Sequence, residues 1–284
     1  MTGRDEARAL GAIAVFAFRE AVGRRLVATV AVLSLCFLGL YALALHEWSV
    51  NVGFHQVPAL QQAAATALLL MGLYAASLLC ALLAIFAAAG AISGEVESGV
   101  LQAVLARPVR RGTVVLGKFA GFGAMLLVYA LALNGAVMLV DRLALRAPVP
   151  HPWAVLAVLC LEPELLLALT LLGSTFLSTL ANGASVLLLY GLGTIGGLFE
   201  QVGVLGGSHA LLEIGVVTSL FIPSDALYRR AASLASAGFG ALVLRLAGPF
   251  GAAAAPGPAI VAYAVLYAAL ALALAVWRFS RRDL

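Results

Sequence analysis

The stretch "AATALLLMGLYAASLLCALLAIFAAAGA", from Ala64 to Ala91, contains no charged residue and no proline. A helix rises about 1.5 Å per residue, so about 20 apolar residues cross the roughly 30 Å hydrocarbon layer of a bilayer. The stretch is long enough to do so, and it predicts a membrane-spanning helix. Because similar runs fill most of the chain, it also decides the fold class.

The composition of the chain is that of an integral membrane protein. Of its 284 residues, 63% are hydrophobic and 11% are charged, whereas soluble domains carry roughly 25% charged residues. We therefore expect an all-α integral membrane protein with a single transmembrane domain over residues 1–284. The predicted spans are about Leu26–Leu45, Ala64–Ala91, Val114–Val140, Leu161–Ala181, Ser185–Gly203 and Pro258–Trp277.

Arginine and lysine are distributed unevenly between alternate connections. They gather before the first predicted span, between the second and third, and after the sixth, whereas residues 46–62 contain none. The positive-inside rule then places both termini in the cytoplasm, and we expect a multi-pass protein of the cytoplasmic membrane. The same rule explains the basic clusters, so we expect no nucleic acid as a partner.

Two segments outside the spans are expected to lie at the membrane surface. Asp5–Gly23 mixes apolar and basic residues at helical spacing, which predicts an interfacial helix, with a solvated basic leader as the alternative. Within residues 205–256, the apolar run "HALLEIGVVTSLF" is too short to span, and a second helix capped by Ser224 follows it. We expect re-entrant or interfacial helices there, on the outer side.

The most polar passage is "SGEVESGVLQAVLARPVRRG", Ser93–Gly112. Its valines and leucines recur at helical spacing, while Glu95 and Gln102 lie on another face, so the passage predicts an amphipathic helix. Pro108 disfavours helical geometry at Arg107 and ends that helix. The result is a short helix and a basic elbow on the cytoplasmic side; a polar loop that only fixes the topology is the alternative.

A family resemblance begins in this passage. Ile92–Gly121, "ISGEVESGVLQAVLARPVRRGTVVLGKFAG", resembles the signature that follows the second span in permease subunits of ABC-2 type transporters. The residues that fall on that pattern are Glu95, Glu97, Gly99, Leu105, Pro108, Arg111, Gly117 and Lys118.

Two further segments extend the resemblance over nearly the whole chain. "LFIPSDALYRR", Leu220–Arg230, is similar to the Pro-Thr-Asp-x-Tyr-Arg segment of the branch that contains the permease for nitrous-oxide-reductase maturation, with Ser224 in place of the threonine. The tail "WRFSRRDL" resembles the basic C-terminus of the same family.

The resemblance implies a permease that pairs with a second copy or a paralogue, binds two ATPase subunits and exports a substrate by alternating access. An accessory protein on the outer side is a further candidate partner. In this family the helix after span two contacts the ATPases. Coupling to them is therefore expected at Glu95, Glu97, Gln102, Arg107, Pro108, Arg110, Arg111 and Lys118.

The chain itself has no ATP-binding motif. The segment "VVLGKFAG" has Phe119 where a phosphate-binding loop needs Ser or Thr, and it lacks the upstream glycine. ATP and Mg²⁺ would therefore bind the partner, and we expect no cofactor on this chain and no enzymatic activity. The alternative function is a membrane anchor or assembly factor that transports nothing.

Polar residues within the predicted spans are the remaining candidates. Asn134 in the third span, and Ser174, Thr175 and Ser178 in the fourth, either line a substrate path or bridge helices by hydrogen bonds.

Glu162 and Glu164 flank Pro163 near the start of the fourth predicted span. If the helix enters the membrane near Leu161, both acids lie among headgroups, and we adopt that interpretation over a functional site within the hydrocarbon. In "GLGTIGG", the spacing of small residues such as Gly193 and Gly197 predicts close helix packing. Cysteine and histidine residues are too scattered to predict a metal site.

Overall fold

The computed structural model describes residues 3–51, 58–97, 110–146, 149–237, 243 and 247–281. Every element of secondary structure within them is helical, which confirms the expected fold class. The helices, in chain order, are α1 (Gly3–Gly23), α2 (Arg25–Asn51), α3 (Pro58–Ala88), α4 (Ser93–Glu97), α6 (Arg111–Leu145), α7 (Pro152–Ser174), α8 (Thr179–Gly206), α9 (His209–Phe221), α10 (Ser224–Ala235), the short 3-10 helix η1 (Gly248–Phe250) and α12 (Ala259–Ser280).

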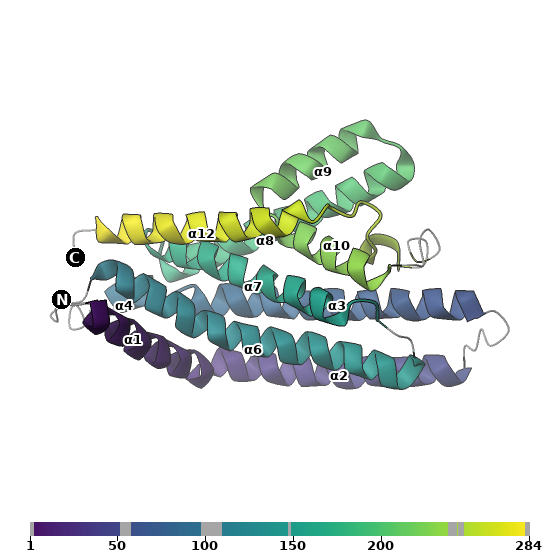
Figure 1. The fold of residues 1–284 in the computed structure, drawn as a ribbon, viewed down its shortest axis with the longest axis horizontal. Coiled ribbons are helices and arrows are strands. Elements are labelled where there is room, and N and C mark those ends of the chain that lie inside the picture. Colours follow the sequence, from purple (N-terminus) through teal and green to yellow (C-terminus); the bar gives the residue numbers. More distant parts are fainter. Residues whose placement is uncertain are drawn as a thin grey trace.

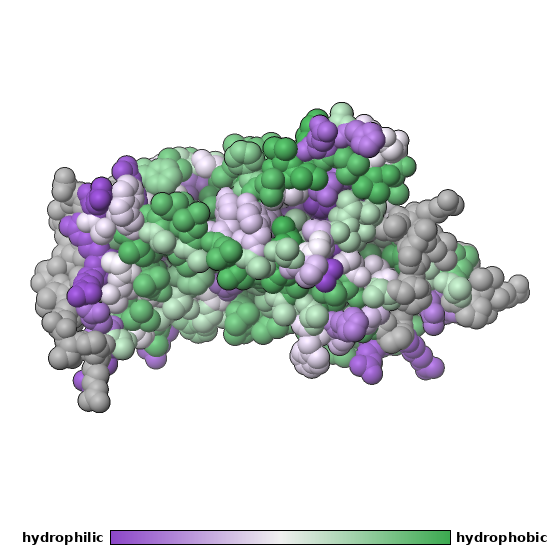
Figure 2. Space-filling model, turned by 45° about the horizontal axis from the view of Figure 1, so that its top comes forward, coloured by the Kyte–Doolittle hydropathy of each residue, from purple (hydrophilic) through white to green (hydrophobic). Residues whose placement is uncertain are grey.

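Six helical segments among the described residues are long and apolar enough to cross a membrane, as the sequence predicted. They run along the long axis of the molecule, and both chain termini lie at one end of it (Figure 1). We call this the terminus end, and the opposite one, where α2 and α6 finish, the far end. Hydrophilic residues gather mainly toward the two ends, with apolar surface between them (Figure 2).

The fourth span differs from the prediction. It is α7, which begins at Pro152 and ends at Ser174, whereas we placed it between Leu161 and Ala181. The prediction was wrong because it placed Glu162 and Glu164 outside the hydrocarbon, where a charged group has a high free-energy cost. The chain instead accommodates both acids inside the helix.

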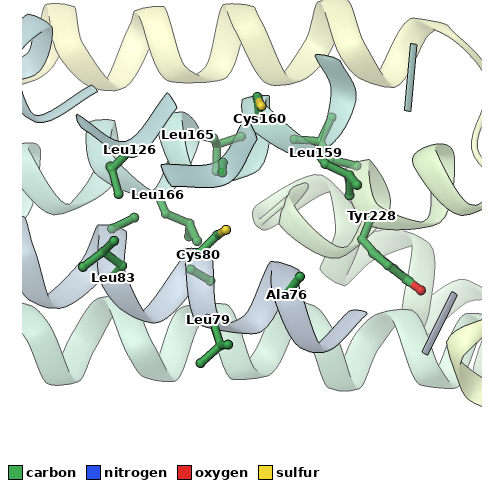
Figure 3. Packing of buried hydrophobic residues seen from close by; sticks show 14 of the residues in the cluster. Ala76, Leu79, Cys80, Leu83, Leu126, Leu159, Cys160, Leu165, Leu166 and Tyr228 are labelled. Carbon is green, nitrogen blue, oxygen red and sulfur yellow. The ribbon is translucent and has the colours of Figure 1, made fainter. Parts of the chain in front are cut away.

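The helices α3 and α7 form the centre of the bundle. In an 18-residue apolar stretch of each of these helices, 67% of the residues are buried in the bundle, whereas the figure for the peripheral α2 is 11%. Figure 3 shows Cys80 of α3 beside Leu166 of α7, with Leu126 of α6 and Tyr228 of α10 around the same core. Small residues such as Ala76, which is completely buried, let the helices approach closely, as membrane helices must.

The first helix, α1, packs on the start of α6 through two glycines. A Cβ atom added at Gly117 would lie 2.7 Å from Ile13 Cγ2, and one at Gly121 would lie 2.7 Å from Ala17 Cβ. At the end of α1, Arg24 donates a hydrogen bond of 2.8 Å to the carbonyl oxygen of Ala87 at the end of α3. The N-terminal helix is therefore fixed to the bundle.

The helices α9 and α10 form a bent pair, with an angle of 107° between them. In Figure 1, α9 runs back along α8, and α10 then turns toward the far end again. The turn between them, Ile222–Pro223, is buried. The hydroxyl oxygen of Tyr228 in α10 lies 2.8 Å from the carbonyl oxygen of Leu70 and 2.9 Å from that of Phe250, and its one proton anchors the pair by a hydrogen bond shared between them.

The contact between α1 and the two glycines of α6 generates a stability prediction. Gly121→Ala should destabilise the protein by about 1–3 kcal/mol, because the new methyl group meets the backbone of Ala14 and cannot be relieved by a rotamer change. Gly11→Ala is the matched control, since a Cβ there meets no atom within 4 Å. Thermal unfolding in detergent, followed by size-exclusion chromatography, measures both, and equal midpoints would contradict the account.

Candidate functional site

The terminus end holds a buried ion pair between two of the expected coupling residues. Lys118 of α6 is only 4% exposed. Its Nζ lies 2.6 Å from Glu95 Oε1 of α4 and donates a hydrogen bond of 2.5 Å to the carbonyl oxygen of Ala91. So deep a lysine presents no group to a soluble partner. Its side chain instead holds the turn between α3 and α4 against α6.

A second ion pair at this end is exposed to water. Arg110 directly precedes α6, and its Nε lies 2.9 Å from Glu6 Oε1 of α1. The Arg110 side chain is 76% exposed. Exposed pairs contribute little to stability, so such an arginine can exchange its carboxylate for one on another protein. Arg111, the first residue of α6, is half-buried.

The other expected coupling residues are only partly placed. Glu97 is the last residue of α4, and only its backbone is described. Gln102, Arg107 and Pro108 lie outside the described residues. The helix α4 covers the first residues of the predicted amphipathic segment, and Arg110, which belongs to the predicted elbow, lies beside α1.

Glu162 lies in the middle of the bundle, which corrects the expectation that it sits among headgroups. It follows ten residues of α7, about 15 Å from the start of that helix. It is 1% exposed, and its Oε2 has no hydrogen-bond partner among the described residues. The hydroxyl groups that face it belong to Ser77 of α3 and Tyr190 of α8. An ionisable group at this depth is a candidate functional residue.

Glu164, which we also expected among headgroups, lies two residues further along α7 and is accommodated by a glycine. A Cβ atom added at Gly123 of α6 would lie 2.7 Å from Glu164 Oε2. The carboxyl group therefore occupies the space that any other residue at position 123 would fill.

A buried charge cluster joins α8 to the bent pair. Arg229 of α10 is 1% exposed, and its guanidinium lies 2.8 Å from both Asp225 Oδ2 and Glu200 Oε2. It also donates hydrogen bonds to Ser219 Oγ at 3.0 Å and to the carbonyl oxygen of Ala254 at 2.9 Å. We call these five residues the Arg229 cluster. It connects α8, α9, α10 and the segment before α12.

The glycines of α8 make the Arg229 cluster sterically possible. A Cβ at Gly197 would collide with the carboxylate of Asp225, and one at Gly193 would lie 3.3 Å from Ile222. The sequence predicts close helix packing at these two glycines. In the structure they face α10 and the turn that precedes it, so the close approach lies within one chain.

The polar residues expected along a substrate path do not come together. Asn134 is fully buried in α6 and donates to the carbonyl oxygen of Ala130 at 2.9 Å. Ser174 and Thr175 lie at the terminus end of α7, where their hydroxyl groups donate to carbonyl oxygens of the preceding turn. Ser178 is exposed just before α8. Asn134 also donates to Cys80 Sγ of α3 at 3.9 Å, so it links two helices.

Sequence reasoning missed three polar residues that tie helices together. Asn182 of α8 donates hydrogen bonds of 2.8 and 2.9 Å to the carbonyl oxygens of Ala89 and Thr170. The positions of Glu200 and Arg229 in the sequence give no sign that their side chains meet. For Arg229 a signal existed, because the segment "IPSDALYRR" places Asp225 four residues before it, one helical turn away.

No group of three His, Cys, Asp or Glu side chains within the described part of the chain is arranged to hold a metal ion. Comparison with known families gives a match over most of the chain. A family model described as "ABC-2 family transporter protein" matches residues 12–284. No curated protein matches the chain closely enough to serve as a relative.

The Arg229 cluster generates the second prediction. Arg229→Leu should destabilise the protein by about 3–5 kcal/mol, because it leaves two buried carboxylates without a cation. Adding Glu200→Gln should recover part of that loss, since one of the unpaired charges disappears. Thermal unfolding in detergent measures each variant.

The matched control is Arg230→Leu, at the neighbouring and half-buried arginine. It should change the midpoint much less than Arg229→Leu. Similar losses for the two variants would show that the buried charge pairs do not hold the bent pair in place.

Proposed function

The chain belongs to the ABC-2 family of transporter proteins, and from this we propose that it is the membrane-spanning subunit of an ATP-driven exporter. Members of the family are transmembrane permeases that work with a separate ABC ATPase. The six spanning segments supply the membrane part. ATP and Mg²⁺ bind the ATPase, while this chain binds neither.

The observation that carries the proposal is the arrangement of the terminus end. There α1, α4 and the start of α6 meet through the buried pair Lys118–Glu95 and the exposed pair Arg110–Glu6. A force applied to the elbow between α4 and α6 reaches α6 directly through Lys118. The same force reaches α1 through Arg110. The terminus end is therefore suited to receive a soluble subunit, and it lies in the cytoplasm.

Substrate passage is proposed to occur between two copies of the chain or between this chain and a paralogue. Ser174 and Thr175 bond to the preceding turn, and Asn134 bonds within α6 and to Cys80 of α3, so the three do not form a continuous polar path. Meanwhile α8 exposes large apolar residues such as Leu188 and Leu192, at 70% and 57%. A second membrane chain can cover such a face. Alternating access then follows from movement of one copy against the other.

The similarity of "LFIPSDALYRR" to the nitrous-oxide-reductase maturation branch favours a system that matures an extracytoplasmic metalloprotein. In the structure that segment carries Arg229, which pairs with Asp225 of the same segment and with Glu200 of α8. These charged residues therefore stabilise the fold.

Affinity purification tests the docking proposal. The tagged chain, extracted from its native membranes in mild detergent, should retain an ABC ATPase identified by mass spectrometry. Arg107→Ala combined with Arg110→Ala should weaken that retention about tenfold or more, because truncated arginines at interfaces commonly cost over about 1 kcal/mol each. Arg230→Ala, on α10, is the control and should retain the ATPase normally.

Two results would contradict the proposal. Equal retention by the double variant and the control would remove the elbow as the docking site. Absence of any ATPase in several detergents would favour a membrane anchor or assembly factor instead of a transporter subunit.

A further inference from the structure

A groove of about 300 Å³ lies between the far ends of α6 and α7. Gly135, Met138 and Arg142 line it from α6, and Trp153 and Leu156 line it from α7. The groove is separate from the terminus end and from the Arg229 cluster. Its size is at the lower end of the range for sites that bind small molecules.

The floor of the groove exists because position 135 has no side chain. A Cβ atom built on Gly135 meets no atom within 4 Å. By contrast, Gly117, Gly121 and Gly123 of the same helix each face a neighbour at van der Waals contact or closer. Helix packing therefore accounts for those three glycines, whereas Gly135 leaves open an apolar space.

The two ends of the groove differ in polarity. Arg142 lies seven residues after Gly135, or about 10 Å further along α6 toward the far end. It is exposed and forms no ion pair with the described residues, while the neighbouring Asp141 is fully buried. Trp153 is 80% exposed beside it, and tryptophan is typical of the boundary between hydrocarbon and headgroups. The groove thus has an apolar floor and one cationic rim.

The charge of the lining indicates which amphiphile fits. The groove residues include one arginine and no aspartate or glutamate. A headgroup with a net negative charge gains an ion pair with Arg142. The amine or choline of a zwitterionic headgroup has no carboxylate there to meet. Charge complementarity therefore favours an anionic lipid over a neutral one.

We infer that this groove is a binding site for a membrane lipid with an anionic headgroup. The lipid phosphate lies at Arg142, and an acyl chain lies over Gly135 and Met138. The site is independent of ATPase docking, so a test of lipid binding and a test of the exporter proposal can give different outcomes. The lipid would link the far ends of α6 and α7 across the connection between them.

Quenching of Trp153 fluorescence by brominated lipids tests the site. Replacing Trp48 and Trp277 with phenylalanine leaves Trp153 as the one tryptophan of the chain, because the sequence contains three. The detergent-purified protein is titrated with phosphatidylglycerol or phosphatidylcholine that carries brominated acyl chains. We expect half-maximal quenching at about fivefold less phosphatidylglycerol, the effect of one ion pair worth up to about 1 kcal/mol.

Two variants in the same background separate the headgroup from the acyl chain. Arg142→Gln should remove the preference for phosphatidylglycerol. Gly135→Leu should fill the floor and reduce quenching by both lipids. Gly39→Leu in α2 is its matched control, because a Cβ at Gly39 also meets no atom within 4 Å, and it should quench as the parent does. Helical circular dichroism and size-exclusion chromatography verify the fold of each variant.

The inference is overturned if the two lipids quench Trp153 equally in the parent, because the contact is then that of unselected surrounding lipid. It is also overturned if Gly135→Leu behaves like Gly39→Leu, or if Arg142→Gln retains the preference for phosphatidylglycerol.

Discussion

A polar group buried in an apolar bundle costs free energy unless it finds a partner within the chain, and this constraint explains the main polar contacts between the helices. Arg229 meets it most fully, with two carboxylates, a hydroxyl group and a carbonyl oxygen around one guanidinium. The constraint also sets steric demands on the facing helix. Gly197 faces Asp225 and Gly173 of α7 faces Asn182, so glycine is required where a polar side chain crosses to the next helix.

The same constraint separates the groups that hold the fold from those that can meet a partner. The sequence predicts that Lys118 and Glu95 contact a partner, yet their ion pair lies inside the chain. Arg110 remains largely exposed. The terminus end therefore combines a rigid internal connection with an accessible basic group. This is the combination that a permease needs in order to receive movement from a soluble ATPase and transmit it to a membrane helix.

The sequence was sufficient for the fold class and for the number of spans, because apolar runs of about 20 residues have few alternative structures. It was insufficient for the bounds of α7. A hydropathy scale assigns Glu162 the same unfavourable free energy in any surroundings, and it cannot show that Ser77 and Tyr190 face this carboxyl group. The family resemblance predicted Lys118 as a coupling residue but gave no indication of its burial. Local spacing indicates only Asp225 as a partner of Arg229, because the other partners come from α8, α9 and the segment before α12.

The central claim is that the terminus end is the surface through which the ATPase acts on this chain. Hydrogen–deuterium exchange of the permease, alone and in complex with its ATPase, tests it most directly. The account predicts slower exchange in the peptides that cover α4, the elbow and the first turns of α6, with no change in the connection between α8 and α9. Slower exchange at that far-end connection, with none at the elbow, would contradict it.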